Sequence, residues 1–180
     1  MEPRNAMIQI AIVEDAASDR KKLQDFVERF FGERGQTVKI FLFSDGTEFL
    51  DDYPSLLDIA FLDIKMKQVD GIRTACMLRE WDRRVLLAFV TNMAHLALEG
   101  YAVDAADFIV KPLDYGGFSA HMDMLMASVL PKRLGNLLVG NKNITALLII
   151  NQISPLNRIP CCNRQQAYPQ PWIFQSGAAG

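Results

Sequence analysis

Short apolar runs alternate with helix-like patterns along the first 130 residues of this 180-residue chain. The runs are rich in β-branched and aromatic side chains, which favours strands. They span 8–13, 37–43, 58–62, 85–90 and 108–110. Strands that alternate with helices predict a parallel sheet covered on both faces. Because the crossovers between parallel strands are right-handed, we expect an α/β fold with a doubly wound sheet of five strands.

Polar residues stand directly after four of the five runs. Glu14 and Asp15 follow the first run, Asp63 the third, Thr91 the fourth and Lys111 the fifth. The carboxyl ends of parallel strands lie at one edge of the sheet, where such folds place their sites. The sequence therefore predicts that these side chains meet at that edge.

Three carboxylates at one edge repel one another, and one of them would hold a proton unless a cation balanced the charge. Magnesium takes oxygen ligands and keeps some of its water. We therefore predict that Glu14, Asp15 and Asp63 bind Mg²⁺. A metal held there would also shield an anionic nucleophile from an anionic phosphoryl group.

The same edge carries the residues needed to accept a phosphoryl group. We predict that Asp63 is a covalent nucleophile that forms an acyl phosphate. Lys111 is a compact cation that can pair with a carboxylate at rest and with a phosphoryl oxygen later. The hydroxyl of Thr91 can donate a hydrogen bond to that oxygen.

These residues lie in segments that together resemble the receiver domain of two-component response regulators. The segments occur in order over about residues 8–130 and span 12–15, 61–66, 70–71, 90–91 and 108–112. The resemblance implies a flavodoxin-like fold with strand order 2-1-3-4-5. It also implies that a sensor histidine kinase phosphorylates Asp63 in the presence of Mg²⁺. Such a domain is not an enzyme beyond catalysing its own phosphorylation and dephosphorylation.

The resemblance assigns further roles residue by residue. It implies that the backbone carbonyl of Lys65 completes the metal site and that Thr91 and Phe108 move together on phosphorylation. It gives Gly71 and Pro112 structural roles, with a cis peptide bond before the proline.

The chain departs from the usual receiver pattern at two positions. Lys67 stands where a proline is usual, which loosens the loop after Asp63 and adds positive charge near the site. Phe108 stands where tyrosine is frequent. Because phenylalanine has no hydroxyl, its movement can be read through packing only.

The last fifty residues differ in character from the rest. All 21 acidic residues lie before residue 131, whereas residues 131–180 contain five basic residues. Residues 91–112 resemble receivers of the LytTR class of transcription regulators, whose output is a mainly β DNA-binding domain. Residues 135–154 resemble the opening of that domain as strand, turn and strand. The prolines from Pro155 onward disfavour a sheet.

We therefore predict a receiver domain over 7–130 and, over 131–180, a linker with a truncated or frame-shifted remnant of a LytTR-type domain. That tail has no firmly assigned structure and is expected to be partly disordered. DNA is an expected partner only if the full output domain is present. A second copy of the chain is a candidate partner after phosphorylation.

The remaining sequence features suit a cytoplasmic protein. No apolar stretch approaches the roughly 20 residues of a membrane helix, and the N-terminus lacks the apolar core of a signal peptide. Met7, directly before the first apolar run, is an alternative to Met1 as the start of translation. Three cysteines form neither a disulfide framework nor a zinc spacing. We expect no membrane partner.

Three other functions share parts of this pattern. A haloacid-dehalogenase-type hydrolase needs a second acid two residues after its aspartyl nucleophile, and Lys65 stands there. A flavodoxin-like flavin binder needs a phosphate-cradling loop after the first strand, where Glu14 and Asp15 stand. A pseudo-receiver would be a protein-interaction module that is never phosphorylated. Lys67 and the incomplete tail leave that alternative open, whereas the presence of all five site residues argues against it.

Overall fold

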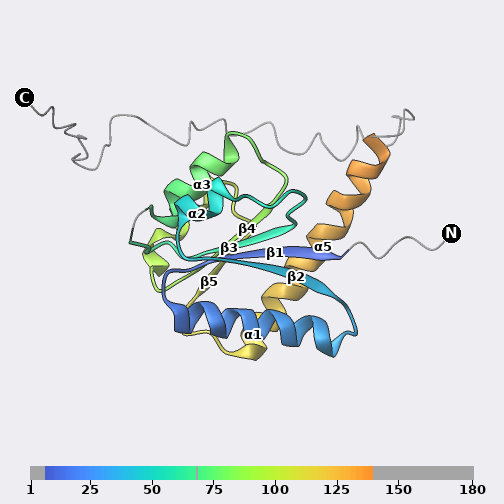
Figure 1. Ribbon diagram of the computed structural model, residues 1–180, viewed down its shortest axis with the longest axis horizontal. Helices are drawn as coiled ribbons and strands as arrows, with labels where there is room; N and C mark the ends of the chain where they lie inside the picture. Colours follow the sequence, from blue (N-terminus) through green and yellow to red (C-terminus); the bar gives the residue numbers. More distant parts are fainter. Residues whose placement is uncertain (1–6, 68, 140–180) are drawn as a thin grey trace, which may run out of the picture.

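The computed structural model describes residues 7–67 and 69–139, and these residues form one five-stranded parallel sheet (Figure 1). The strand order is β2-β1-β3-β4-β5, which confirms the predicted order and the doubly wound fold. The strands are β1 (Ile8–Val13), β2 (Val38–Phe43), β3 (Ile59–Leu62), β4 (Leu86–Thr91) and β5 (Asp107–Val110). Their bounds agree with the predicted runs to within one or two residues.

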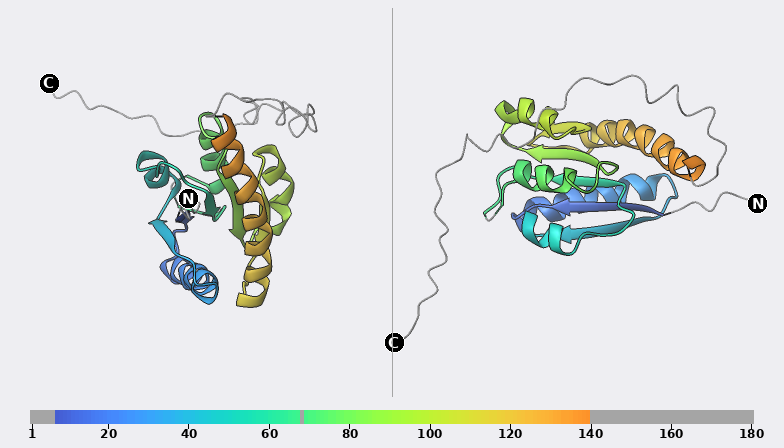
Figure 2. Two further views of the ribbon diagram at one scale, coloured as in Figure 1. Left: turned by 90° about the vertical axis from the view of Figure 1, so that its right-hand side faces the viewer. Right: turned by 90° about the horizontal axis from the view of Figure 1, so that it is seen from above.

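Helices cover both faces of the sheet (Figures 1 and 2). The helices are α1 (Ala17–Glu33), α2 (Gly46–Asp51), α3 (Gly71–Arg79), η1 (Ala94–Leu96), α4 (Ala97–Ala102) and α5 (Tyr115–Val139). Buried residues of α1 and α5 pack on one face, and those of α2 and α3 pack on the other. Among the described residues, no helix is both long and apolar enough to cross a membrane.

Helix α5 runs farther than the sequence pattern suggested. The receiver domain was predicted to end at residue 130, whereas this helix continues through Pro131 to Val139 (Figure 2). A proline inside a helix removes one backbone hydrogen bond and favours a kink or a break, but it does not end this helix. The predicted output-domain remnant lies, from residue 140 on, outside the described residues.

Successive side chains of the central strands point to opposite faces of the sheet. In β3, Ile59 and Phe61 belong to the core under α1 and α5, whereas Ala60 and Leu62 belong to the core under α2 and α3. Strands β1 and β4 divide in the same way, with Ile10 and Ile12 on the α1 side. The middle of the sheet is therefore buried on both faces. The alternation also fixes which face each side chain at a strand end points towards.

Gly71 fixes the start of α3 against the end of β3. Its N–H donates to the carbonyl of Ile64 at 2.9 Å. A Cβ atom at this position would lie 2.2 Å from the backbone oxygen of Asp63. Asp70 caps the helix by accepting a hydrogen bond from the N–H of Arg73 at 2.8 Å. Only a residue without a side chain lets the helix approach the loop this closely.

Replacing Gly71 by alanine is expected to destabilise the chain by about 2 kcal/mol or more, because the clash is with backbone atoms that cannot rotate away. The matched control is Gly32→Ala in α1, where an added Cβ meets no atom within 4 Å. That control is expected to be neutral or stabilising, since alanine favours a helix over glycine. Urea unfolding of both variants measures the difference. Equal stabilities for the two variants would contradict this account of Gly71.

Candidate functional site

The ammonium group of Lys111 lies among three carboxylates at the carboxyl edge of the sheet. Its Nζ is 2.6 Å from Glu14 Oε2, 2.8 Å from Asp19 Oδ2 and 3.4 Å from Asp63 Oδ2. Glu14 and Asp63 are buried, whereas the Asp19 side chain is 42% exposed. The structure thus brings together three residues that the sequence predicted and one that it did not.

The facing of the strands explains why these side chains converge. Ile10 and Ile12 in β1, Phe61 in β3 and Ile109 in β5 all point into the core under α1 and α5. The side chains two residues after Ile12, Phe61 and Ile109 point the same way. They are Glu14, Asp63 and Lys111, each directly after the end of its strand. The register adds to this, because the N–H of Asp63 donates to the carbonyl of Val13 at 2.9 Å.

Both carboxylate oxygens of Glu14 accept a short hydrogen bond. Its Oε1 accepts a hydrogen bond from the N–H of Ala16 at 3.0 Å, and its Oε2 accepts from Lys111. Burial raises the pKa of Glu14, and the negative charge of Asp63 acts in the same direction, while the hydrogen bonds from Lys111 and Ala16 partly oppose the rise. The ionised form of Glu14 is therefore less favourable here than in water.

Lys111 keeps its positive charge in this setting. Burial disfavours the ammonium form, but hydrogen bonds to Asp19 and Glu14 and the charge of Asp63 outweigh it and raise the pKa of Lys111. The peptide bond between Lys111 and Pro112 is cis, as predicted.

Asp63 combines an anchored backbone with a lightly held carboxylate. Its Oδ1 accepts from the N–H of Lys65 at 3.3 Å, and its Oδ2 accepts from Lys111 at 3.4 Å. Both distances lie beyond the range of strong hydrogen bonds. An oxygen of Asp63 can therefore attack an electrophile without first breaking a strong bond.

The predicted metal ligands are close in the fold but are not assembled around a common point. Within the described part of the chain, no group of three or more His, Cys, Asp or Glu side chains is arranged to hold a metal ion. In this arrangement the ammonium of Lys111 balances Glu14 and Asp63. The half-buried carboxylate of Asp15 makes no hydrogen bond or ion pair with any described residue. The donor set of hard carboxylate oxygens still suits magnesium.

Thr91 and Phe108 lie on the opposite face of the sheet from the lysine cluster. Thr91 is fully buried, and its Oγ1 accepts from the N–H of Met93 at 3.3 Å. The Phe108 ring lies 6.0 Å from the Phe89 ring, within the core under α2 and α3. The Thr91 hydroxyl bonds to neither Asp63 nor Lys111 in this structure, although the Thr91 carbonyl accepts from the N–H of Lys111 at 2.9 Å.

Asp19 is the site residue that sequence reasoning missed. It stands in the first turn of α1, which begins at Ala17, two residues after Asp15. A first-turn acid is ordinarily explained by the helix dipole. No pattern in the sequence singles it out from other first-turn acids, because its contact with Lys111 depends on where α1 lies over the sheet.

Comparison with known proteins agrees with the fold. Residues 10–122, which lie within the predicted 7–130 domain, match the family model described as response regulator receiver domain. The chain belongs to the response regulator receiver domain family.

Two curated relatives are named as signalling or regulatory proteins. The sensory transduction protein LytT of Bacillus cereus is 30% identical over 112 residues, covering 60% of this chain and 43% of LytT. The transcriptional regulatory protein BtsR of Escherichia coli is 26% identical over 163 residues, covering 90% of this chain and 61% of BtsR. The chain spans about half the length of these relatives. Their names agree with the predicted LytTR-type resemblance.

A solved receiver structure shares the fold. The response regulator protein TrrA from Thermotoga maritima, in complex with Mg(2+)-BeF, superposes with a TM-score of 0.56 at 22% identity. The match covers 66% of this chain and 99% of TrrA.

Replacing Glu14 by glutamine is expected to stabilise the metal-free chain by about 1 kcal/mol at neutral pH, because the variant removes a charge that burial disfavours. The raised pKa sets the pH dependence. Below the unfolded-state pKa the wild-type carboxyl is neutral in both states, so the two proteins differ least there. The wild type loses stability relative to the variant as the pH rises towards the folded-state pKa, and the difference is constant above it.

Urea unfolding in EDTA, from a pH below the unfolded-state pKa of Glu14 up to neutral pH, measures the difference in stability. Glu28→Gln, at an exposed position of α1, is the matched control and is expected to change stability by less than about 0.5 kcal/mol. A less stable Glu14→Gln protein at neutral pH would show that the ion pair with Lys111 outweighs the cost of burial.

Proposed function

We propose that this chain accepts a phosphoryl group on Asp63 from a sensor histidine kinase in a magnesium-dependent reaction and thereby controls transcription. The observation that carries the proposal is the state of Asp63. Its backbone is pinned to β1, and its carboxylate accepts two long hydrogen bonds, one of them at 3.4 Å from the charged ammonium of Lys111. A buried nucleophile with a nearby cation suits attack on an anionic phosphoryl group.

In the transfer step, a carboxylate oxygen of Asp63 attacks the phosphorus of the donor. An O–P bond forms, the P–N bond of the donor phosphohistidine breaks, and the departing imidazole takes a proton from solvent. With acetyl phosphate as donor, a P–O bond breaks and acetate leaves. Lys111 pairs with an oxygen of the transferred group and offsets its charge.

Glu14, Asp15 and Asp63, with the backbone carbonyl of Lys65, are the residues proposed to hold Mg²⁺. The bound metal would neutralise charge on the phosphoryl oxygens. The carboxylate of Asp15, which has no bonding partner among the described residues, supports this assignment because it can serve as a ligand. Glu14 contributes an oxygen to the same edge, and burial raises its pKa, so a bound cation would favour its charged form.

The proposed conformational change connects the two faces of the sheet. The Thr91 hydroxyl turns from the N–H of Met93 to donate to a phosphoryl oxygen, and the Phe108 ring moves with it. Phe108 packs on Phe89 and close to Gly100 of α4, where a Cβ would lie 3.5 Å from both rings. A change at Thr91 therefore reaches the α4 surface through packing.

The wider role is inferred from the relatives. We propose that the chain works in the cytoplasm with a histidine kinase, and that a second copy is its partner after phosphorylation. Transcription control through DNA requires a full output domain of the LytTR type, and the remnant predicted for this chain lies, from residue 140 on, outside the described residues. The relatives named as regulatory proteins support this role.

Incubation with acetyl phosphate and Mg²⁺ is expected to add one phosphoryl group to the chain, read by intact mass. The adduct should be absent from Asp63→Asn and in EDTA, because nucleophile and metal are both required. Asp51→Asn, at the exposed end of α2, is the control and should be modified like the wild type. No adduct on the wild type would favour the pseudo-receiver alternative, and an equal adduct on Asp63→Asn would place the modification elsewhere.

Replacing Thr91 by valine is expected to preserve modification of Asp63 but to uncouple it from the α4 surface. Valine matches the shape of threonine and lacks its hydroxyl, so the variant loses the bond from Met93 at a cost of about 1 kcal/mol. Hydrogen exchange over residues 97–110, before and after phosphorylation, is the measurement. The wild type and Thr91→Ser should respond, whereas Thr91→Val should not. The same response in all three would remove Thr91 from the switch.

A further inference from the structure

Asp19 is a closer partner of the site lysine than the proposed nucleophile is. The Nζ of Lys111 lies 2.8 Å from Asp19 and 3.4 Å from Asp63. An ammonium group has three N–H donors, and its two short bonds go to Glu14 and Asp19. Lys111 is thus drawn towards α1 and makes its weakest contact with Asp63.

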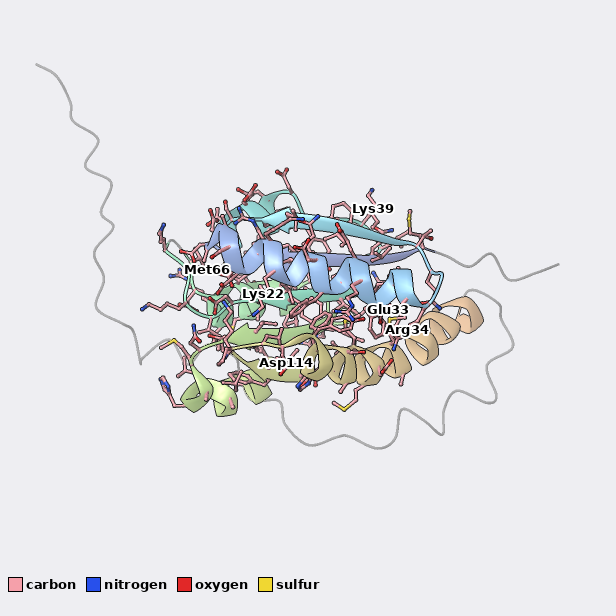
Figure 3. All side chains as sticks on the ribbon, turned by 90° about the horizontal axis from the view of Figure 1, so that it is seen from below. Lys22, Glu33, Arg34, Lys39, Met66 and Asp114 are labelled. Atoms are coloured by element: carbon pink, nitrogen blue, oxygen red, sulfur yellow. The ribbon has the colours of Figure 1, made fainter. Side chains whose placement is uncertain are left out.

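The surroundings of Asp19 allow this contact to be broken. Asp19 and Lys111 border a cavity of about 240 Å³, which Lys22 and Leu23 of α1 also line. In Figure 3, Lys22 lies on α1 on the same side of the molecule as Met66, away from Glu33 and Arg34 at the other end of the helix. Among the described residues, the carboxylate of Asp19 bonds to Lys111 alone. The side chain of Asp19 is partly exposed, so a water molecule can take its place as the hydrogen-bond acceptor of Lys111.

We propose that Asp19 is a positioning residue that holds the Lys111 ammonium away from Asp63 and so slows phosphoryl transfer to that carboxylate. The inference rests on the proposed function. Lys111 has to leave Asp19 to pair fully with a phosphoryl oxygen on Asp63. The negative charge of Asp19 also repels an anionic donor that approaches the site. Both effects act in the same direction, so the unphosphorylated state is favoured when the donor is scarce.

The test compares Asp19→Asn, which keeps the shape and removes the charge, with Asp19→Glu, which keeps the charge. The matched control is Asp25→Asn, an exposed aspartate of the same helix that bonds to Lys21 at 2.6 Å. The full chain is incubated with acetyl phosphate and Mg²⁺, and the initial rate of adduct formation is read by intact mass. We expect Asp19→Asn to react about three- to tenfold faster than the wild type, with a smaller gain at high salt. Asp19→Glu should react at close to the wild-type rate, and Asp25→Asn at the same rate as the wild type.

A second measurement reports position without any donor. In a crystal structure of Asp19→Asn, the Lys111 Nζ is expected to lie within about 3 Å of an Asp63 carboxylate oxygen. An unchanged lysine position would overturn the proposal whatever the rates. Thermal unfolding of the variants separates this role from a purely structural one at the start of α1, because a stability change alone would leave the rate unaltered.

The outcomes distinguish this inference from the proposed function. If the wild type forms an adduct on Asp63 and Asp19→Asn is no faster, only the role of Asp19 is wrong. If Asp25→Asn accelerates as much as Asp19→Asn, the effect belongs to net charge, and the positioning role is wrong. If the wild type forms no adduct, the proposed function fails and this inference fails with it.

Discussion

Burial of the central strands on both faces is the constraint on which the rest of this structure depends. A slip of one residue between β1 and β3 would exchange the side chains that face α1 with those that face α3. The register Ala11 with Ala60 and Val13 with Leu62 prevents this, because small and large side chains are already matched to each core. The same register sets Asp63 beside Val13. The meeting of Glu14 and Asp63 is therefore a consequence of how the core is packed.

The packing also creates an electrostatic problem that Lys111 resolves. Two buried carboxylates at one edge lack water to stabilise their charges, and burial raises the pKa of Glu14 as a result. Buried ion pairs seldom add net stability, yet removal of one partner leaves an uncompensated charge that is costly. Lys111 thus offsets at rest the charge of the same carboxylates that are proposed to bind the metal and to accept the phosphoryl group. A transferred phosphoryl group would compete for this one cation, which makes the partners of Lys111 decisive for the chemistry.

Local patterns were sufficient to predict the fold and three residues of the cluster. The strand order follows from alternating runs and a family resemblance, and Glu14, Asp63 and Lys111 each stand directly after a strand. Asp19 was missed because its contact depends on where α1 lies over the sheet, which no local pattern records. The continuation of α5 through Pro131 was not predicted, because a proline usually interrupts a helix.

The alternation of the strands also separates two jobs that a phosphorylation switch has to perform. Lys111 and Thr91 are neighbours through a backbone hydrogen bond, yet the lysine side chain joins the carboxylates on the α1 side while Thr91 packs on the other face. The charged side chains therefore meet on one face of the sheet, and the apolar contacts of Phe108 lie on the opposite face. Since Phe108 has no hydroxyl, the proposed switch at Thr91 would act through the contact of Phe108 with Phe89 and the nearby glycine of α4. A tightly packed contact of that kind responds to a small shift by changing its arrangement, which is what converts a local charge into an altered surface.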